Sequence, residues 1–246
     1  MSQGKSELAE RDPSSPVSVS LVIPNWNGED LLRIYLPSVV VATEAYPGEA
    51  EIIVVDDGST DDSVGLLRRS FPSVRLVRHK RNRGFGRACM TGARAARHPI
   101  VVLLNSDMCV EPHFLAPLMI PFDDRSTFAA SPLILDESGR MSGVTLSIPY
   151  LRRGKIRYRS FPAATLVTDG AAAPGPWYTL FPSGGACALD RRRFLDLGGF
   201  DDLFHPFYYE DTDLGFRAWR RGWTCRVVPA SRVTHCHTAT IARYFN

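Results

Sequence analysis

The sequence lacks the features that mark a secreted or a membrane-spanning protein. No apolar run approaches the roughly 20 residues of a membrane-spanning helix, and the amino terminus has no apolar signal-peptide core. The five cysteines are odd in number, widely spaced and form no Cys-x-x-Cys pair, which predicts reduced thiols and makes a zinc site a weak interpretation. We therefore expect a soluble, non-exported protein in the cytoplasm.

The sequence also lacks a strong charge imbalance. Its net charge of +3 is too small to indicate a partner. Basic residues cluster at 78–83 and 152–159, but neither run lies in a nucleic-acid-binding motif, and a solvated loop face is the commoner meaning of such runs. We expect no nucleic-acid partner.

The length of 246 residues suffices for one large α/β domain. Residues 1–16 are rich in serine, proline and mixed charge, which predicts a flexible leader before a single domain over residues 17–246. Residues 242–246 end without a helix terminator or a polar tail, so we expect the natural protein to be longer.

Strands alternate with helices over the first 107 residues, which predicts βαβ units and a mostly parallel sheet. Right-handed crossovers place the strand ends on one edge. Pro37 is expected to kink the first helix or to start its second half. Residues 136–181 lose all periodicity and are interpreted as a substrate-facing lobe or a mobile loop. The expected strands are 17–23, 51–55, 74–77, 100–104 and 224–228, and the expected helices follow Glu29, Asp61, Arg87, Asp190 and Asp211.

Three acidic clusters lie at the ends of apolar or aromatic runs. They are Asp56-Asp57-Gly58-Ser59, Asn105-Ser106-Asp107 and Glu210-Asp211-Thr212-Asp213. In an open α/β sheet, ligands bind in the crevice beyond the carboxyl ends of the strands. The clusters therefore predict one shared site for a cation and a polar substrate.

Each of the first two clusters has an alternative interpretation. Asp107 either joins Mg²⁺ or Mn²⁺ to a diphosphate or caps a helix over residues 108–115. Asp57 either accepts hydrogen bonds from a nucleobase or ribose or belongs to an ordinary turn. Trp26 either stacks on that base or packs on Pro24. The glycine pair Gly84-Phe85-Gly86 is weak evidence for a phosphate loop.

The third cluster combines acids with aromatic residues. On a helix from about residue 211, Glu210 and Asp213 share one face while Asp211 points elsewhere, so we expect one catalytic acid and capping by the rest. The favourable interaction of acids with a helix amino terminus explains part of this composition without any function. The preceding Phe204, Phe207, Tyr208 and Tyr209 are expected to desolvate a carboxylate and to shape a sugar-sized pocket.

Two histidines follow the last expected strand. His235 and His237 point the same way in an extended chain, so either is a candidate metal ligand; a histidine that merely satisfies hydrogen bonds is the alternative. A histidine beside a carboxylate suits Mn²⁺ somewhat better than Mg²⁺.

Six motifs in this order resemble the family 2 glycosyltransferases of GT-A fold. The resemblance covers roughly residues 17–237. The motifs are Val-Ser-Leu-Val-Ile-Pro-Asn-Trp-Asn-Gly (19–28), Val-Val-Asp-Asp-Gly-Ser-Thr-Asp (54–61), Asn-Arg-Gly-Phe-Gly (82–86), Leu-Leu-Asn-Ser-Asp (103–107), Gly-Gly-Ala (184–186) and Glu-Asp-Thr-Asp-Leu-Gly-Phe-Arg (210–217).

The resemblance implies an inverting transfer of a hexosyl or deoxyhexosyl group (EC 2.4) from a UDP-, dTDP- or GDP-linked sugar, with a nucleotide-binding half at 17–107 and an acceptor-binding half at 108–246. It implies Asp211 as general base and Asp107 with His235 as ligands of Mn²⁺ or Mg²⁺. Asn105 stands where the family's Asp-x-Asp motif has its first aspartate. The other implied roles are nucleotide binding by Pro24, Trp26, Asp57, Asn82, Gly84 and Ser106, and an acceptor and donor pocket at Gly184, Gly185, Ala186 and Glu210.

Within the family, the segment around Asp211 most resembles bacterial cell-surface polysaccharide enzymes, including rhamnosyl-type transferases. The implied acceptor is a glycan or a lipid-linked glycan, with peripheral association at the inner face of the membrane. Two alternatives stay open: a non-catalytic member that only binds the nucleotide sugar, prompted by Asn105, and a sugar-nucleotide nucleotidyltransferase. The second is disfavoured because residues 24–28 do not form a glycine-rich basic loop.

Overall fold

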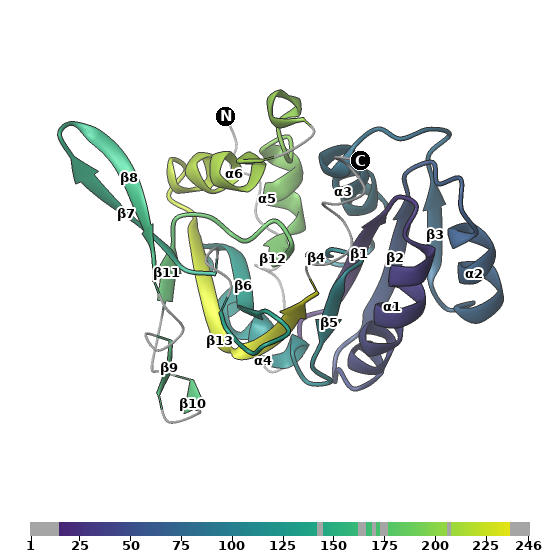
Figure 1. The fold of residues 1–246 in the computed structure, drawn as a ribbon. Coiled ribbons are helices and arrows are strands. Elements are labelled where there is room, and N and C mark those ends of the chain that lie inside the picture. The colour runs from purple at the N-terminus through teal and green to yellow at the C-terminus, as the bar shows by residue number, and fades with distance from the viewer. Residues whose placement is uncertain are drawn as a thin grey trace.

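The computed structural model describes residues 15–141, 145–161, 166–168, 171–172, 177–205 and 208–236. Most of its strands belong to one nine-stranded sheet with the order β11-β13-β6-β12-β4-β1-β2-β3, and β5 pairs with β13 beside this path (Figure 1). The expected leader falls largely, and the expected truncation entirely, outside the described residues.

The first half of the sheet is parallel, as the sequence predicts. Strands β1 (Val19–Asn25), β2 (Ala50–Asp56), β3 (Arg75–Arg78) and β4 (Ile100–Leu104) run in the same direction. They are connected by α1 (Glu29–Glu44), α2 (Ser63–Ser70) and α3 (Phe85–Ala95). The carboxyl ends of the strands therefore meet at one edge.

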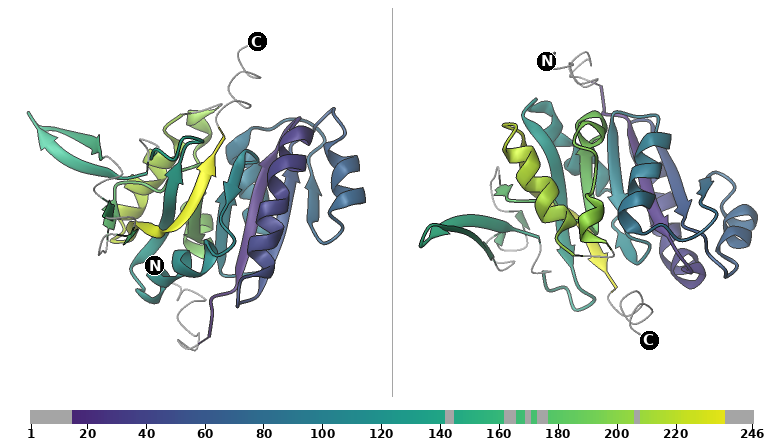
Figure 2. Two further views of the ribbon diagram at one scale, coloured as in Figure 1. Left: turned by 60° about the horizontal axis from the view of Figure 1, so that its bottom comes forward. Right: turned by 90° about the horizontal axis from the view of Figure 1, so that it is seen from above.

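Helices cover both faces of this sheet, which explains why its central strands are apolar without alternation. Leu21 and Ile23 of β1 pack in one core with α1 and α2, while Val22 between them packs in the opposite core with α3. The second core also contains side chains of α5 (Arg191–Asp196) and α6 (Glu210–Trp219). Figure 2 shows these two helical layers.

Helix α1 does not divide at Pro37, contrary to one expectation. The helix is continuous from Glu29 to Glu44. Pro37 lies on its exposed side, so the carbonyl that loses its intrahelical donor faces water.

The second half of the sheet is mixed, so the prediction of a mostly parallel sheet holds only for residues before 107. Strand β12 (Ala186–Asp190) runs antiparallel to both β4 and β6 (Thr127–Leu135). The long β13 (Thr224–His235) runs parallel to β6 and antiparallel to β11 (Trp177–Thr179). Strand β13 extends well past residue 228, where the sequence placed its end.

Two helices of this half confirm their sequence signals. Asp190 caps α5 by accepting a hydrogen bond from the Arg193 N–H at 3.0 Å, and Gly198 and Gly199 follow the helix with positive φ. Helix α6 begins at Glu210 and is followed by Gly222, which also has a positive φ. A short α4 (Leu115–Met119) and a 3₁₀ turn (Ile120–Asp123) precede β6.

Residues 136–181 contain strands where the sequence suggested a lobe or a loop. Strands β7 (Ser147–Arg152) and β8 (Lys155–Ser160) form a projecting hairpin, and β9 (Val167–Thr168) pairs with β10 (Ala171–Ala172).

All five cysteines are free thiols. No helix in the described ranges is long and apolar enough to cross a membrane.

Candidate active site

The predicted site residues gather at one edge of the sheet because three parallel strands end there. Asp57 follows β2, and residues 105–107 follow β4. Strand β12 begins at the same edge, since Ala186 pairs with Leu104, the last residue of β4. The Asn105 N–H donates to the Gly185 carbonyl at 2.9 Å, which joins the second acidic cluster to the glycine motif.

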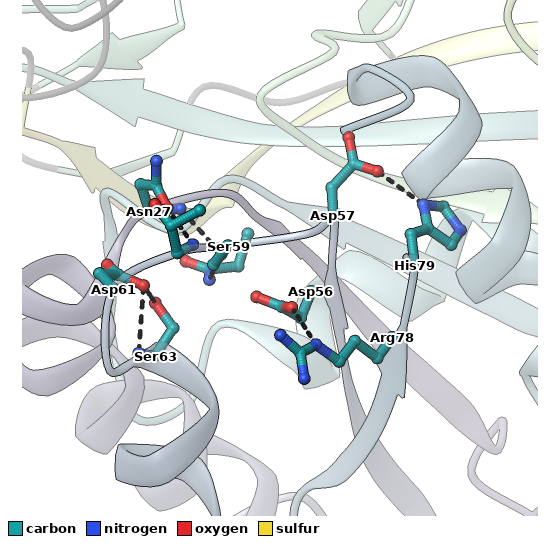
Figure 3. Close-up of polar contacts among 10 residues, drawn as sticks. Asn27, Asp56, Asp57, Ser59, Asp61, Ser63, Arg78 and His79 are labelled. Atoms are coloured by element: carbon teal, nitrogen blue, oxygen red, sulfur yellow. Dashed lines mark hydrogen bonds and ion pairs between the residues drawn. The ribbon is translucent and has the colours of Figure 1, made fainter. Parts of the chain in front are cut away.

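Asp57 organises the loop that follows β3. Its buried carboxylate lies 2.6 Å from His79 Nδ1 and accepts hydrogen bonds from the N–H groups of Arg83 and Gly84 at 2.8–3.0 Å. An ionised carboxylate only accepts, so Nδ1 donates to Asp57, and Nε2 shares a hydrogen bond with the Thr91 hydroxyl at 2.9 Å. Figure 3 shows the contact with His79. Asp57 thus fixes the position of the predicted nucleotide loop.

Asn82 and Gly84 complete this loop. Asn82 Oδ1 accepts a second hydrogen bond from the Gly84 N–H, at 2.9 Å. Gly84 has φ +91°, a conformation that residues with a side chain rarely adopt. The neighbouring Asp56 carboxylate is fully buried and contacts Arg78 Nε at 3.2 Å (Figure 3).

The loop after β1 is held by the first acidic motif, residues 54–61. Pro24 is the penultimate residue of β1 and Trp26 follows the strand, half-buried. Asn27 accepts a hydrogen bond from the Thr60 N–H at 2.7 Å and its own N–H donates to Ser59 at 2.9 Å. This ties the loop to the first acidic motif.

Ser106 is placed against the same loop. A Cβ added to Gly28 would lie 3.7 Å from Ser106 Oγ and 2.4 Å from Asn25 Oδ1, so Gly28 leaves just enough room between the two polar side chains. Asn25 Oδ1 is buried and has no hydrogen-bond partner within the described part of the chain. Nucleotide contacts of these residues stay a prediction.

Asp107 and His235 meet through a strand pair that the sequence did not predict. Residues Met108–Val110 form β5 rather than the helix of the alternative interpretation, so that interpretation is wrong. Met108 pairs with His235, the last residue of β13, and the Cys236 N–H donates to the Asp107 carbonyl. His235 Nε2 consequently lies 3.3 Å from Oδ1 of the buried Asp107.

One carboxylate and one imidazole fit Mn²⁺ or Mg²⁺ as part of its ligand set. The described residues hold no group of three or more His, Cys, Asp or Glu side chains that would bind a metal by themselves. Mg²⁺-type sites use one or two protein ligands and complete their shell with water and phosphate oxygens, which fits one carboxylate and one imidazole. His237 lies outside the described residues.

Asp211 lies against the glycine motif in the first turn of α6. Its Oδ2 accepts a hydrogen bond from the Gly184 N–H at 3.1 Å, and its Oδ1 accepts from the Thr212 N–H at 2.6 Å. Burial raises the pKa of Asp211, and these hydrogen bonds partly oppose the rise. A Cβ on Gly185 would lie only 2.9 Å from Met108 Cε, so a side chain there would press on the residue next to Asp107.

The other acids of this cluster have different surroundings. Burial, followed by the nearby Asp211, raises the pKa of Glu210, whose Oε2 is buried without a hydrogen-bond partner in the described ranges. We expected the non-catalytic acids to cap the helix. Asp213 does not do so, because its carboxylate pairs with Arg217 at 2.7 Å. Tyr209 precedes α6 with a φ of +82°, a strained conformation of the kind found at functional sites.

The aromatic approach to Asp211 differs from its prediction. Tyr208 and Tyr209 are 59% and 60% exposed, so these rings do not bury the carboxylate; the backbone around Gly184 lies against it instead. Phe204 is half-buried, and Phe207 lies outside the described residues. Glu210 lines a narrow cleft between residues 83–87 and 200–205. Beside that cleft, α3 and residues 197–202 line a cavity of about 610 Å³.

Residues 20–173 match the family model described as Glycosyl transferase family 2. This chain belongs to that family. The match begins at β1 and includes the loops that carry Asp57, Asn82, Ser106 and Asp107.

Curated relatives include the polypeptide N-acetylgalactosaminyltransferase 11 of Xenopus tropicalis, 32% identical over 75% of this chain and 32% of its own length. The polypeptide N-acetylgalactosaminyltransferase 16 of Homo sapiens is 29% identical over 75% of this chain and 34% of its own. The chain thus spans about one third of the length of these relatives.

Solved structures share the fold of the family 2 chain. GalNAc-T7 with UDP, GalNAc and Mn²⁺ has a TM-score of 0.68 at 22% identity, covering 92% of this chain and 45% of its own. The mannosyltransferase PcManGT of Pyrobaculum calidifontis, with GDP-Man and Mn²⁺, has a TM-score of 0.66 at 19% identity and covers 97% of this chain and 64% of its own. S. aureus TarS 1–349 with UDP-GlcNAc has a TM-score of 0.65 at 15% identity and covers 93% of this chain and 61% of its own. The expected GT-A fold is confirmed.

Sequence reasoning missed His79. The residue was counted in a basic run interpreted as a solvated face, yet it is buried between Asp57 and Thr91. Its place directly after β3, at the same sheet edge as Asp57, was the available signal.

Proposed function

We propose that this protein is an inverting glycosyltransferase, which moves a hexosyl or deoxyhexosyl group from a nucleoside-diphosphate sugar to an acceptor hydroxyl by a single displacement. The observation that carries the proposal is one continuous line of contacts at the sheet edge. It runs from the Asp107–His235 pair through Asn105 and Gly185 to Gly184 and Asp211. These contacts support one site for a candidate metal ligand, Asp107, and a candidate base, Asp211.

The donor would lie across the ends of β1, β2 and β4. Asp57 and Asn82 hold the loop at Gly84, and the ends of these strands are the edge at which an open α/β sheet binds a nucleotide. The solved neighbours named above contain UDP, UDP-GlcNAc or GDP-Man, which supports a UDP- or GDP-linked donor, and a dTDP-linked donor stays a prediction from the resemblance.

Asp107 and His235 would hold a divalent metal ion together with oxygens of the donor diphosphate. A bound Mn²⁺ or Mg²⁺ supplies neutralisation of the negative charge that develops on the leaving diphosphate. Mn²⁺ is named with two of the solved neighbours. The imidazole of His235 favours Mn²⁺ over Mg²⁺.

Asp211 would accept the proton of the attacking hydroxyl. The Gly184 N–H holds Oδ2 and the Thr212 N–H holds Oδ1, so the carboxylate is oriented before the acceptor arrives. Its pKa is raised by burial, which makes the ionised form a stronger base than an exposed aspartate. Glu210, in the adjoining cleft, would hold a second acceptor hydroxyl.

We propose a glycan or a lipid-linked glycan as acceptor, in the synthesis of a bacterial surface polysaccharide at the inner face of the cytoplasmic membrane. A second candidate is a hydroxyl of a polypeptide, because the curated relatives named above are polypeptide N-acetylgalactosaminyltransferases. Transfer assays with both classes of acceptor distinguish these two candidates.

The test is release of nucleoside diphosphate and transfer of labelled sugar, with a panel of donors, Mn²⁺, and glycan, lipid-linked and peptide acceptors. Asp211→Asn should lower the rate by about 10²–10⁴-fold, because the proton acceptor is lost. Asp213→Asn is the matched control two residues further along the same helix and should keep its activity, since Asp213 pairs with Arg217. An Asp211→Asn enzyme as fast as the wild type would remove Asp211 from the reaction.

A further inference from the structure

The β7–β8 hairpin stands away from the body of the protein. Pairs from Ser147 with Ser160 to Arg152 with Lys155 form an antiparallel ladder, and Arg153 and Gly154 make the turn, both with positive φ. In Figure 1 the hairpin extends past the edge of the main sheet, and both views of Figure 2 show the same projection.

The hairpin is cationic and carries exposed apolar side chains. No acidic residue occurs from Ser138 to Thr168, whereas residues 152–159 contain five lysines and arginines. Leu151, next to the turn, is 74% exposed, and Ile148, Tyr150 and Tyr158 are also exposed. Strand register places Ile148 and Tyr150 on the face that carries Arg157 and Arg159, with Leu151 and Tyr158 on the other.

Only the base of the hairpin is held by the rest of the described chain. Ser147 is buried, its carbonyl accepts a hydrogen bond from the Leu180 N–H at 2.6 Å, and Tyr158 packs edge-on against Phe181. An isolated two-stranded hairpin is marginally stable in water, and an exposed leucine at its end is costly to leave solvated.

We propose that the β7–β8 hairpin docks on an anionic lipid bilayer, with Leu151 and Tyr150 at the interface and the basic side chains against lipid headgroups. Charge complementarity carries the choice of occupant, because the patch has five cations and no acid to repel a negative surface. A membrane fits better than a nucleic acid, since Leu151 next to the turn suits the headgroup–acyl boundary and has no base-stacking role.

Docking through this hairpin would orient the active site toward the membrane. Phe181, which contacts the base of the hairpin, lies three residues before Gly184, the residue that holds Asp211. A sugar acceptor carried on a lipid would then meet Asp211 from the hairpin side. The orientation rests on the proposed function, whereas the membrane contact itself does not.

The test is co-flotation of the purified chain, without donor or metal, with vesicles of phosphatidylcholine alone and of phosphatidylcholine with one third phosphatidylglycerol. The wild type should float only with the anionic vesicles, and the binding should fall when salt rises from ~0.1 M to ~0.5 M. The triple variant Arg152→Gln, Arg153→Gln, Lys155→Gln should lower the partition coefficient by about 100-fold, at about fivefold for each charge near the surface.

Two further variants separate the patch from overall charge. The control Arg68→Gln, Lys80→Gln, Arg97→Gln removes the same charge from exposed positions in the nucleotide-binding half and should float as the wild type does. Leu151→Ser should weaken flotation by about tenfold through the lost apolar contact. Circular dichroism of each variant should match the wild type, as expected for exposed positions.

Three results would overturn the proposal: no flotation of the wild type, equal loss in the control triple variant, or unchanged flotation of the hairpin triple variant. Tighter binding to an RNA oligonucleotide than to vesicles, lost in the hairpin variant alone, would assign the surface to nucleic acid instead. Because the assay contains no donor, a failed transfer reaction leaves its outcome unaffected.

Discussion

Replacing Asp57 by alanine should loosen the loop that follows β3 before any ligand is added. The Asp57 carboxylate accepts from the N–H groups of Arg83 and Gly84 and from His79 Nδ1, all at 3.0 Å or less. Alanine removes the acceptor of the Arg83 N–H and of His79 Nδ1, whereas the Gly84 N–H keeps its hydrogen bond to Asn82 Oδ1 at 2.9 Å. The sequence alternative for Asp57, an ordinary turn residue, predicts a much smaller effect.

The magnitude follows from the number of stranded donors. A buried donor without a partner costs about 1–3 kcal/mol, so for two donors we expect a loss of about 2–5 kcal/mol in the free energy of unfolding, allowing for some rearrangement of His79. Asp57→Asn keeps one acceptor oxygen and should cost about 1.5–3 kcal/mol, the contribution of a charged hydrogen-bond partner. We therefore also predict the order of stability: the wild type is the most stable, followed by Asp57→Asn and then by Asp57→Ala.

Urea unfolding monitored by circular dichroism measures these differences, and hydrogen exchange of the Arg83 and Gly84 amides locates them. Asp62→Ala is the control, because its exposed pair with Arg69 contributes little, and its midpoint should match that of the wild type. An Asp57→Ala protein as stable as the control, with unchanged amide protection, would refute the assignment of Asp57 as the organiser of this loop.

Three further predictions concern the other parts of the site. Burial raises the pKa of Glu210 above 4.5, so the stability of the wild type should fall as pH rises through that pKa. Glu210→Gln should therefore have a higher Tm than the wild type at neutral pH and the same Tm below about pH 4.5. A Tm difference that is constant at all pH values would contradict this. Gly215→Ala should destabilise by about 1–3 kcal/mol in urea unfolding, because the new Cβ would lie 2.6 Å from Phe181 Cα, and an unchanged midpoint would show that α6 shifts freely. The proposed base is the ionised form of Asp211, whose pKa burial raises, so the acid limb of the rate should lie above the ordinary aspartate pKa of about 3.9; a limb at or below that value would exclude Asp211 as the group that titrates.

The nucleotide-binding half was predictable because its signals are local. The apolar run at 100–104 followed by Asn105-Ser106-Asp107 indicates a buried strand that ends in a polar turn, and β4 has those bounds. The cap at Asp190 and the glycines after α5 are equally local. Parallel topology then placed Asp57 and Asp107 at one edge without any knowledge of side-chain contacts.

The remainder depends on partners distant in sequence. Residues 108–110 have no intrinsic strand pattern and become β5 only because β13 reaches them. The same pairing brings His235 to Asp107, a contact that the sequence justified only by position and residue type. His79 was misassigned because its neighbours are exposed basic residues, while its own burial comes from Asp57 and α3. The roles of individual site residues stay predictions.

The most direct test of the account is the thermal stability of the protein with nucleoside-diphosphate sugars in the presence and absence of Mn²⁺. A matching donor at about 100 times its Kd adds about 2.7 kcal/mol, which should raise Tm by about 5–10 °C for a domain of this size. The account predicts this shift only when donor and Mn²⁺ are present together, and its loss in Asp107→Asn and in His235→Ala. A full shift without metal, or an undiminished shift in both variants, would contradict the metal-assisted donor site.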